Sequence, residues 1–221
     1  MLIAYRKRDS KANNPVISHE ILANPLIISA VVVGFLCNLV FYGAMFIFSI
    51  YFQSKLHLSA LETGLAFMPM MALTALVNFS SKWFVHWLSV RSLSLLGSII
   101  SLIGFGMVMF ISPDWSATQL YIPMILLGSG TSFAMPVMTN LVLGQATNKS
   151  AGSASALFNC ARQMGGVTGV AIFGLLLSSA GVNNMSDGLK MVSLAASGIS
   201  LFWLIMGLKK LPEQKLHSIC Q

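Results

Sequence analysis

The sequence has little charge. Only 9% of its 221 residues are Asp, Glu, Lys or Arg, against about 25% in soluble globular domains. Charge is absent altogether from six long stretches, which are Ile21–Ser54, Thr63–Ser81, Ser92–Pro113, Trp115–Asn148, Gln163–Ser186 and Met191–Leu208. About 20 helical residues cross the hydrocarbon core of a bilayer. The missing charge therefore argues against a water-soluble core and predicts an integral membrane protein.

Acidic residues are missing from every predicted span. A proton-coupled carrier needs a titratable group in its path, usually a carboxylate, and intramembrane carboxylates mark such proton relays. Either the coupling group lies on another polypeptide, or this chain does not couple to protons.

Cysteine and histidine are too few and too scattered to predict a disulfide framework or a metal site. Cys37 and Cys160 lie in apolar stretches, Cys220 is next to last, and no CxxC spacing occurs. The four histidines do not cluster. None lies at membrane depth to activate a nucleophile such as Ser129, so we expect no enzyme. We also expect no cofactor and no metal.

The predicted fold class is an all-α membrane protein, a bundle of six transmembrane helices. Each crossing must be helical because unpaired backbone groups are not tolerated in lipid, and the polar alternation of β-barrel strands is absent. The predicted spans are about 27–52, 63–81, 92–112, 119–143, 155–179 and 190–208. They make up a transmembrane domain, 27–208, between a basic N-terminal segment, 1–26, and a basic tail, 209–221.

The basic residues predict the orientation, because Lys and Arg near span ends collect on the cytoplasmic side. With the N-terminus inside, the outside holds only Lys55 and Lys190 of the 13 basic residues. Both termini are then cytoplasmic and the protein lies in the plasma membrane, the inner membrane of a bacterium. Because the basic residues lie at helix ends rather than on one solvated face, we expect no nucleic-acid partner.

Polar residues inside the spans are the candidates for a substrate pathway. Arg162 is the charge placed deepest, about eight residues into the fifth span, where it either anchors in the inner leaflet by snorkelling or faces the bundle. The other candidates are Asn38, Tyr42, Met45, Tyr51, Gln53, Thr139, Asn140, Asn159 and Gln163.

Small residues and prolines predict where helices pack or move. Gly165 and Gly169, with Gly166 beside them, form a stripe that lets two helices approach closely, either as static packing or as a sliding seam. Pro69 and Pro136 lie inside the second and fourth spans, where each removes a backbone hydrogen bond and favours a kink. The second, fourth and fifth spans are therefore better pathway candidates than the nearly apolar third and sixth.

Two segments carry a family resemblance. The run SAGSASALFNCARQMGGVTGVA at 150–171 resembles the loop and fifth span of a carrier half in the EmrB/QacA-type, 14-span multidrug efflux branch of the major facilitator superfamily. The runs YFQ at 51–53 and SALETGLAFMP at 59–69 resemble the turn between the first two spans of that half. A cytoplasmic loop at Lys82–Arg91 lies where the superfamily often has a gating motif, and only Lys82 and Arg91 keep its basic character.

The resemblance implies a drug:proton antiporter whose cavity lies between two six-helix halves, this chain being the C-terminal half. It implies alternating access, with the first, second, fourth and fifth spans at the pathway. The partners expected are the bilayer, small amphipathic substrates, and a missing N-terminal half or a second copy. We expect a fragment, a split-gene product or a degraded carrier. The alternative is a membrane protein that transports nothing, a remnant or assembly partner of a carrier.

Overall fold

The computed structural model describes residues 19–110, 116–180 and 185–213, and these are almost entirely helical. A short helix, α2 (His19–Ala23), precedes six long ones. The long helices are α3 (Pro25–Ile50, continued by the π-helix η1, Tyr51–Lys55), α4 (Ala60–Trp87), α5 (Val90–Met109), α6 (Ala117–Gln145), α7 (Ala151–Ser179) and α8 (Met185–Lys210). All six are long and apolar enough to cross a bilayer, which confirms the predicted all-α six-helix bundle.

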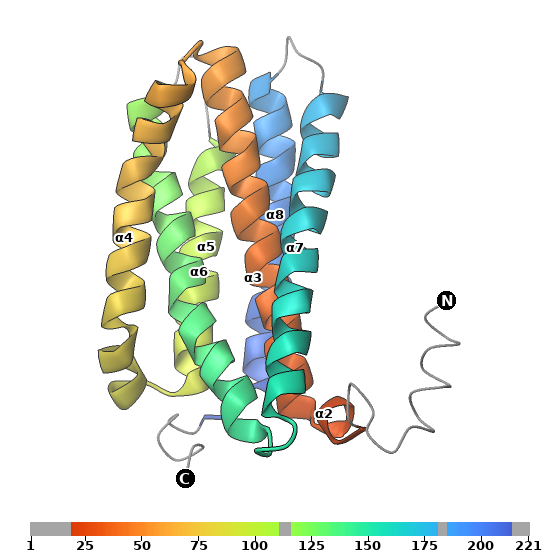
Figure 1. Ribbon diagram of the computed structural model, residues 1–221. Coiled ribbons are helices and arrows are strands. Elements are labelled where there is room, and N and C mark those ends of the chain that lie inside the picture. The colour runs from red at the N-terminus through yellow and green to blue at the C-terminus, as the bar shows by residue number, and fades with distance from the viewer. Residues whose placement is uncertain (1–18, 111–115, 181–184, 214–221) are drawn as a thin grey trace.

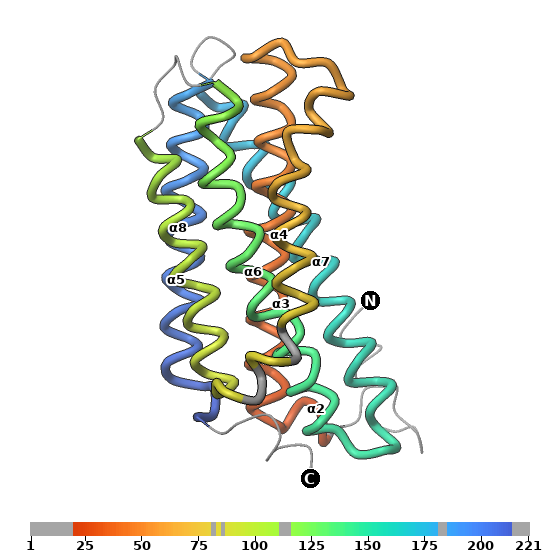
Figure 2. The backbone as a smooth tube through the Cα atoms, turned by 90° about the vertical axis from the view of Figure 1, so that its left-hand side faces the viewer, coloured from red at the N-terminus to blue at the C-terminus, as the bar shows by residue number. Residues whose placement is uncertain are grey.

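The six long helices form two layers (Figure 1). In the four-helix layer, α4, α6, α3 and α7 lie side by side, because α4 contacts α6, α6 contacts α3, and α3 contacts α7. In the two-helix layer, α5 and α8 contact each other and pack against α6 and α3. Figure 2 shows α5 and α8 together on one side of the molecule.

Polar caps fix the helix starts. Asn24 caps α3, its Oδ1 accepting from the backbone N–H of Leu26 at 2.9 Å, with Pro25 at the first helical position. Ser59 and Glu62 form a capping box at α4, in which Glu62 Oε2 accepts from Ser59 N at 2.8 Å and Ser59 Oγ accepts from Glu62 N at 3.3 Å. These caps explain why the chain turns within the few residues between η1 and α4.

The basic loop predicted at Lys82–Arg91 is shorter than expected, which corrects the sequence analysis. Lys82 lies inside α4, which continues to Trp87, and Arg91 is the second residue of α5. Only Leu88 and Ser89 join the two helices, and Ser89 Oγ caps α5 by accepting from Ser92 N at 3.1 Å. A basic residue near a span end indicates the membrane surface but does not by itself end a helix. The exposed rings of Trp83 and Trp87 suit the interfacial belt at that depth.

The first turns of α3 and the last turns of α8 lie at the same end of the bundle (Figure 1). At this end Asn24 Nδ2 donates to Gln145 Oε1 at 3.3 Å, and Arg91 N donates to Pro212 O at 3.2 Å. The guanidinium of Arg91 also pairs with Glu213. The end of η1 and the start of α8 lie at the opposite end, so the six helices amount to an even number of crossings.

Candidate functional site

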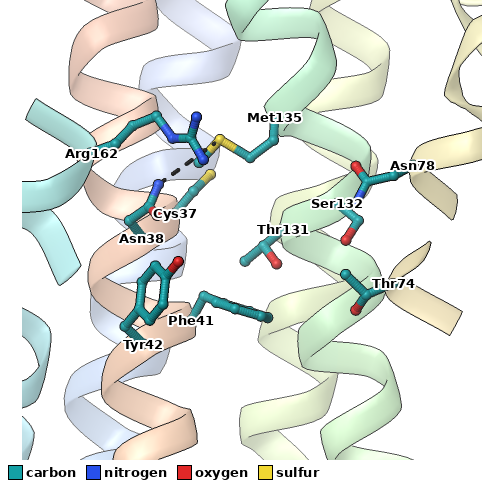
Figure 3. A pocket seen from close by; sticks show the side chains of 10 residues that line it. All are labelled: Cys37, Asn38, Phe41, Tyr42, Thr74, Asn78, Thr131, Ser132, Met135 and Arg162. Atoms are coloured by element: carbon teal, nitrogen blue, oxygen red, sulfur yellow. Dashed lines mark hydrogen bonds between the residues drawn. The ribbon is translucent and has the colours of Figure 1, made fainter. Parts of the chain in front are cut away.

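A cavity of about 190 Å³ lies inside the four-helix layer and takes residues from all four of its helices (Figure 3). The lining residues are Cys37, Asn38, Phe41 and Tyr42 of α3, Thr74 and Asn78 of α4, Thr131, Ser132 and Met135 of α6, and Arg162 of α7. Neither α5 nor α8 lines it. The wall is polar and apolar in about equal parts, which is more polar than the mostly apolar pockets that small ligands usually occupy.

Arg162 carries the only charge on the cavity wall. Its side chain reaches from α7 across α3 toward Met135 of α6 (Figure 3). The guanidinium carbon lies 5.7 Å from the ring centroid of Phe158, within range of a cation–π contact. Its Nε is buried without a hydrogen-bond partner, and among the described residues no carboxylate pairs with it. The fold thus places an uncompensated cation at the edge of the cavity.

The other polar groups of the cavity differ in how they are satisfied. Asn38 Nδ2 donates to Gly34 O at 3.0 Å. The hydroxyls of Thr131 and Ser132 donate to Gly128 O at 3.0 and 2.7 Å, so only their lone pairs remain for a ligand. Thr74 Oγ1 is buried with no partner in the described part of the chain. Among the buried atoms of the cavity wall, Arg162 Nε and Thr74 Oγ1 are therefore the donors that have no partner in the described part of the chain.

A second, shallower hollow of about 380 Å³ lies over the contact between α3 and α7. It is almost entirely apolar and is lined by Tyr42, Gln163, Gly166, Val167, Val170 and Ala171. Tyr42 borders both spaces. A Cβ on Gly166 would lie 3.1 Å from the Tyr42 ring, so this glycine makes room for the tyrosine side chain.

The two glycines that flank this hollow hold α3 and α7 in close contact. A Cβ on Gly165 would lie 2.2 Å from Phe35 O, and one on Gly169 would lie 2.1 Å from Leu39 O. The stripe read from the sequence is therefore a tight backbone seam. Pro69 and Pro136 lie inside α4 and α6, the two helices that meet on the far side of the cavity.

The predicted pathway residues lie in several places. Asn38, Tyr42, Arg162 and Gln163 line the two hollows. Met45 packs against the hydrophobic core, and Tyr51 is fully buried in it. Gln53 is exposed, and its Nε2 donates to Ser49 Oγ at 3.0 Å. Thr139 Oγ1 donates to its own helix at Met135 O, while Asn140 and Asn159 are exposed. Their part in any pathway stays a prediction.

Sequence reasoning placed the second span, α4, at the pathway but named neither of its polar residues that line the cavity. Thr74 and Asn78 are one helical turn apart and both face the cavity. Thr131 and Met135 repeat that spacing on α6, as do Asn38 and Tyr42 on α3. Polar residues four apart in an apolar helix share one face. That spacing is the signal that could have found them.

The two layers differ in what they expose along their membrane-spanning lengths. The four-helix layer exposes amide side chains at Asn140, Asn159 and Gln163. The two-helix layer exposes only apolar residues and one glycine between its charged ends, among them Leu96, Ile99, Ile103, Leu194, Leu201 and Ile205. Lipid accommodates the second surface well and the first poorly, because amides find no hydrogen-bond partner in hydrocarbon.

The comparisons with known proteins agree with this architecture. A family model described as Major Facilitator Superfamily matches residues 4–170. The chain belongs to the Major Facilitator Superfamily. It is therefore an integral membrane protein of a family of transporters, with six membrane-length helices in the described residues.

Relatives of this superfamily chain include drug-resistance proteins. It is 27% identical to the methylenomycin A resistance protein of Bacillus subtilis over 79% of this chain and 38% of that protein. It is 26% identical to the multidrug resistance protein 3 of Bacillus subtilis, over 84% of this chain and 36% of that protein. It is 24% identical to the drug efflux pump JefA of Mycobacterium tuberculosis, over 85% of this chain and 37% of that protein. The chain thus spans just over a third of the length of these relatives.

Among solved structures, a POT family transporter in complex with a thioalcohol-conjugated peptide has the same fold. The TM-score is 0.69 at 15% identity, and the alignment covers 92% of this chain but 42% of that one. This likeness concerns the arrangement of helices only.

Proposed function

We propose that the bundle is one half of an efflux carrier of the 14-span multidrug branch, its C-terminal six helices, and that it moves amphipathic compounds out of the cell by alternating access. No catalytic step is proposed. The observation that supports this proposal is the difference between the two layers in the side chains that they expose. The cavity and the exposed amides belong to α3, α4, α6 and α7, whereas α5 and α8 present an apolar surface suited to lipid.

The partner proposed is a second six-helix half, or a second copy of this chain, packed against the four-helix layer. Its presence would cover Asn140, Asn159 and Gln163 or enclose them around water, which removes the cost of facing lipid with amides. It also supplies the carboxylate that proton coupling requires, since the described spans place no acid near the cavity. The relatives' greater length leaves room for such a half.

The function is tested by transport of the neutral dye Nile red in a bacterial strain deleted for its own efflux pumps. We expect no efflux from this chain alone. We expect uncoupler-sensitive efflux when the chain is fused to the segment of multidrug resistance protein 3 that it does not align with. Within the fusion, Thr131→Trp fills the cavity and is expected to abolish efflux.

The matched control for that fusion is Leu194→Trp, which adds the same ring to the exposed surface of α8 and is expected to leave efflux intact. Efflux by the chain alone would contradict the need for a second half. A well-expressed fusion without efflux would instead support the remnant described above.

The orientation proposed places the Asn24, Arg91 and Lys149 end in the cytoplasm of the cell. In a background with the native cysteines replaced, Lys149→Cys should react with a membrane-impermeant maleimide only after the cells are opened, and Lys55→Cys in intact cells. Both lysines are exposed at opposite ends of the bundle, so the pair is matched in residue type and accessibility. The reverse pattern would contradict the rule that places Lys and Arg inside.

A further inference from the structure

We propose that the cavity recognises an anion, an aromatic weak acid whose carboxylate binds Arg162 and whose ring lies against Phe41, Tyr42 and Met135. This inference rests on the proposed function, because it names the class of amphipathic compound that the site takes. It concerns the charge of the ligand, which the fold does not specify and for which the relatives give no anionic precedent, one of them being named for resistance to methyl viologen, a dication.

The first step is the charge of the wall. Arg162 is the one ionised group there, and no Asp or Glu lines the cavity. An arginine at membrane depth is costly, and such residues commonly pair with an acid or with backbone carbonyls. Here the guanidinium lies over the Phe158 ring, and among the described residues it makes no hydrogen bond. The site therefore lacks the negative charge that would balance it.

The second step is the balance of donors and acceptors. Arg162 has N–H groups free, and Thr74 Oγ1 is a buried hydroxyl without a partner. The hydroxyls of Thr131 and Ser132 already donate to backbone carbonyls. A cationic ligand would meet the guanidinium charge with no acid to offset it. A carboxylate can accept from the guanidinium in the bidentate geometry that arginine favours.

The third step is the size and shape of the cavity. A volume of about 150 Å³ lined by apolar side chains is enough to hold benzene, so about 190 Å³ in this half alone holds an aromatic ring. Figure 3 shows Phe41 and Tyr42 near one end of the space and Arg162 near the other. Ring and carboxylate of one small molecule can then meet both ends at once.

The test is equilibrium binding to the purified full chain in lipid nanodiscs of three probes that share one ring. The probes are 2-naphthoate, 2-naphthamide and 2-naphthylmethylammonium, with charges of −1, 0 and +1, followed by their own fluorescence. We expect the affinity to fall in that order, with naphthoate about tenfold tighter than the amide, as a charged hydrogen bond implies. Arg162→Gln should weaken naphthoate about tenfold and leave the amide unchanged, and Arg162→Lys should restore part of the loss.

The control for net charge is Lys149→Gln, which removes a cation from the exposed α6–α7 turn and should leave all three affinities unchanged. Equal affinities for the three probes, a preference that survives Arg162→Gln, or an equal loss in the Lys149 variant would each overturn the anion assignment. If the probes bind with no preference for charge but are still excluded by Thr131→Trp, the transport proposal stands and only this inference fails. If no probe binds, this inference fails, and the transport proposal is decided separately by Nile red efflux from the fusion.

Discussion

Gly169→Ala is expected to lower the free energy of unfolding by about 3 kcal/mol, the upper end of overpacking effects. The added Cβ would lie 2.1 Å from Leu39 O and 2.8 Å from Leu39 C. Both obstacles are backbone atoms of α3, which cannot rotate away as a side chain can, so α7 must move off α3 along the seam. The measurement is reversible unfolding by SDS in mixed micelles, followed by circular dichroism.

The matched control is Gly198→Ala in α8, a glycine in mid-helix whose added Cβ meets nothing within 4 Å. Alanine favours the helix by about 1 kcal/mol over glycine, so this variant should be as stable as the parent or slightly more so. Gly165→Ala, with Phe35 O at 2.2 Å, should behave like Gly169→Ala. Two glycine variants that unfold like Gly198→Ala would show that α3 and α7 do not touch along this line.

The seam shows what the sequence could and could not predict about packing. Glycines four apart predict that some helix approaches closely, because the stripe they form has no side chains. They do not say which helix, and it is α3, four helices earlier in the chain. The spans themselves were predictable to within a few residues because length and missing charge determine them. The end of α4 was not, because the helix continues past Lys82 to Trp87.

The candidate site was predictable only where one residue is unusual by itself. Arg162 stands out as a charge in an apolar run, and Asn38 as a polar side chain in mid-span. Thr139 and Asn140 lie further along α6 than Thr131 and Ser132. The latter pair lines the cavity close to Gly128, where Met70 and Thr74 of α4 lie against α6. The direction of a side chain toward a cavity depends on which helices surround it, and that order is set by tertiary packing.

The two-helix layer reads as almost purely apolar in sequence, yet polar groups are buried at its seams. Ser94, Ser98 and Ser101 of α5 are buried, as are Ser193 and Ser200 of α8. Their small side chains let helices approach closely, as at Gly97, where an added Cβ would lie 2.4 Å from Gly130 O. Ser94, Ser98 and Ser101 recur at i, i+4 and i+7, so the sequence places them on one helix face, but it does not say which helix packs against that face.

Trp203→Ala is expected to cost about 3 kcal/mol in the same unfolding assay. Trp203 is fully buried, and its Nε1 donates to Ser94 Oγ at 3.0 Å, joining α8 to α5. Loss of a buried tryptophan side chain costs about 3–5 kcal/mol in soluble cores, and the lower end applies here because lipid is as apolar as the helix contact. The expected cost of Trp203→Ala therefore comes from the lost packing and the lost hydrogen bond.

Trp87→Ala is the matched control, because the same ring is removed from a side chain that is 81% exposed at the end of α4. Its effect on unfolding should stay within about 0.5 kcal/mol, as for surface substitutions generally. Trp203→Phe keeps most of the packed volume and loses only the donor to Ser94, so it should fall between the two, at about 1 kcal/mol. If the loss of stability is largest for Trp203→Ala, smaller for Trp203→Phe and smallest for Trp87→Ala, packing between α5 and α8 is the main contribution. If Trp203→Phe cost as much as Trp203→Ala, the hydrogen bond to Ser94 would instead hold this layer together.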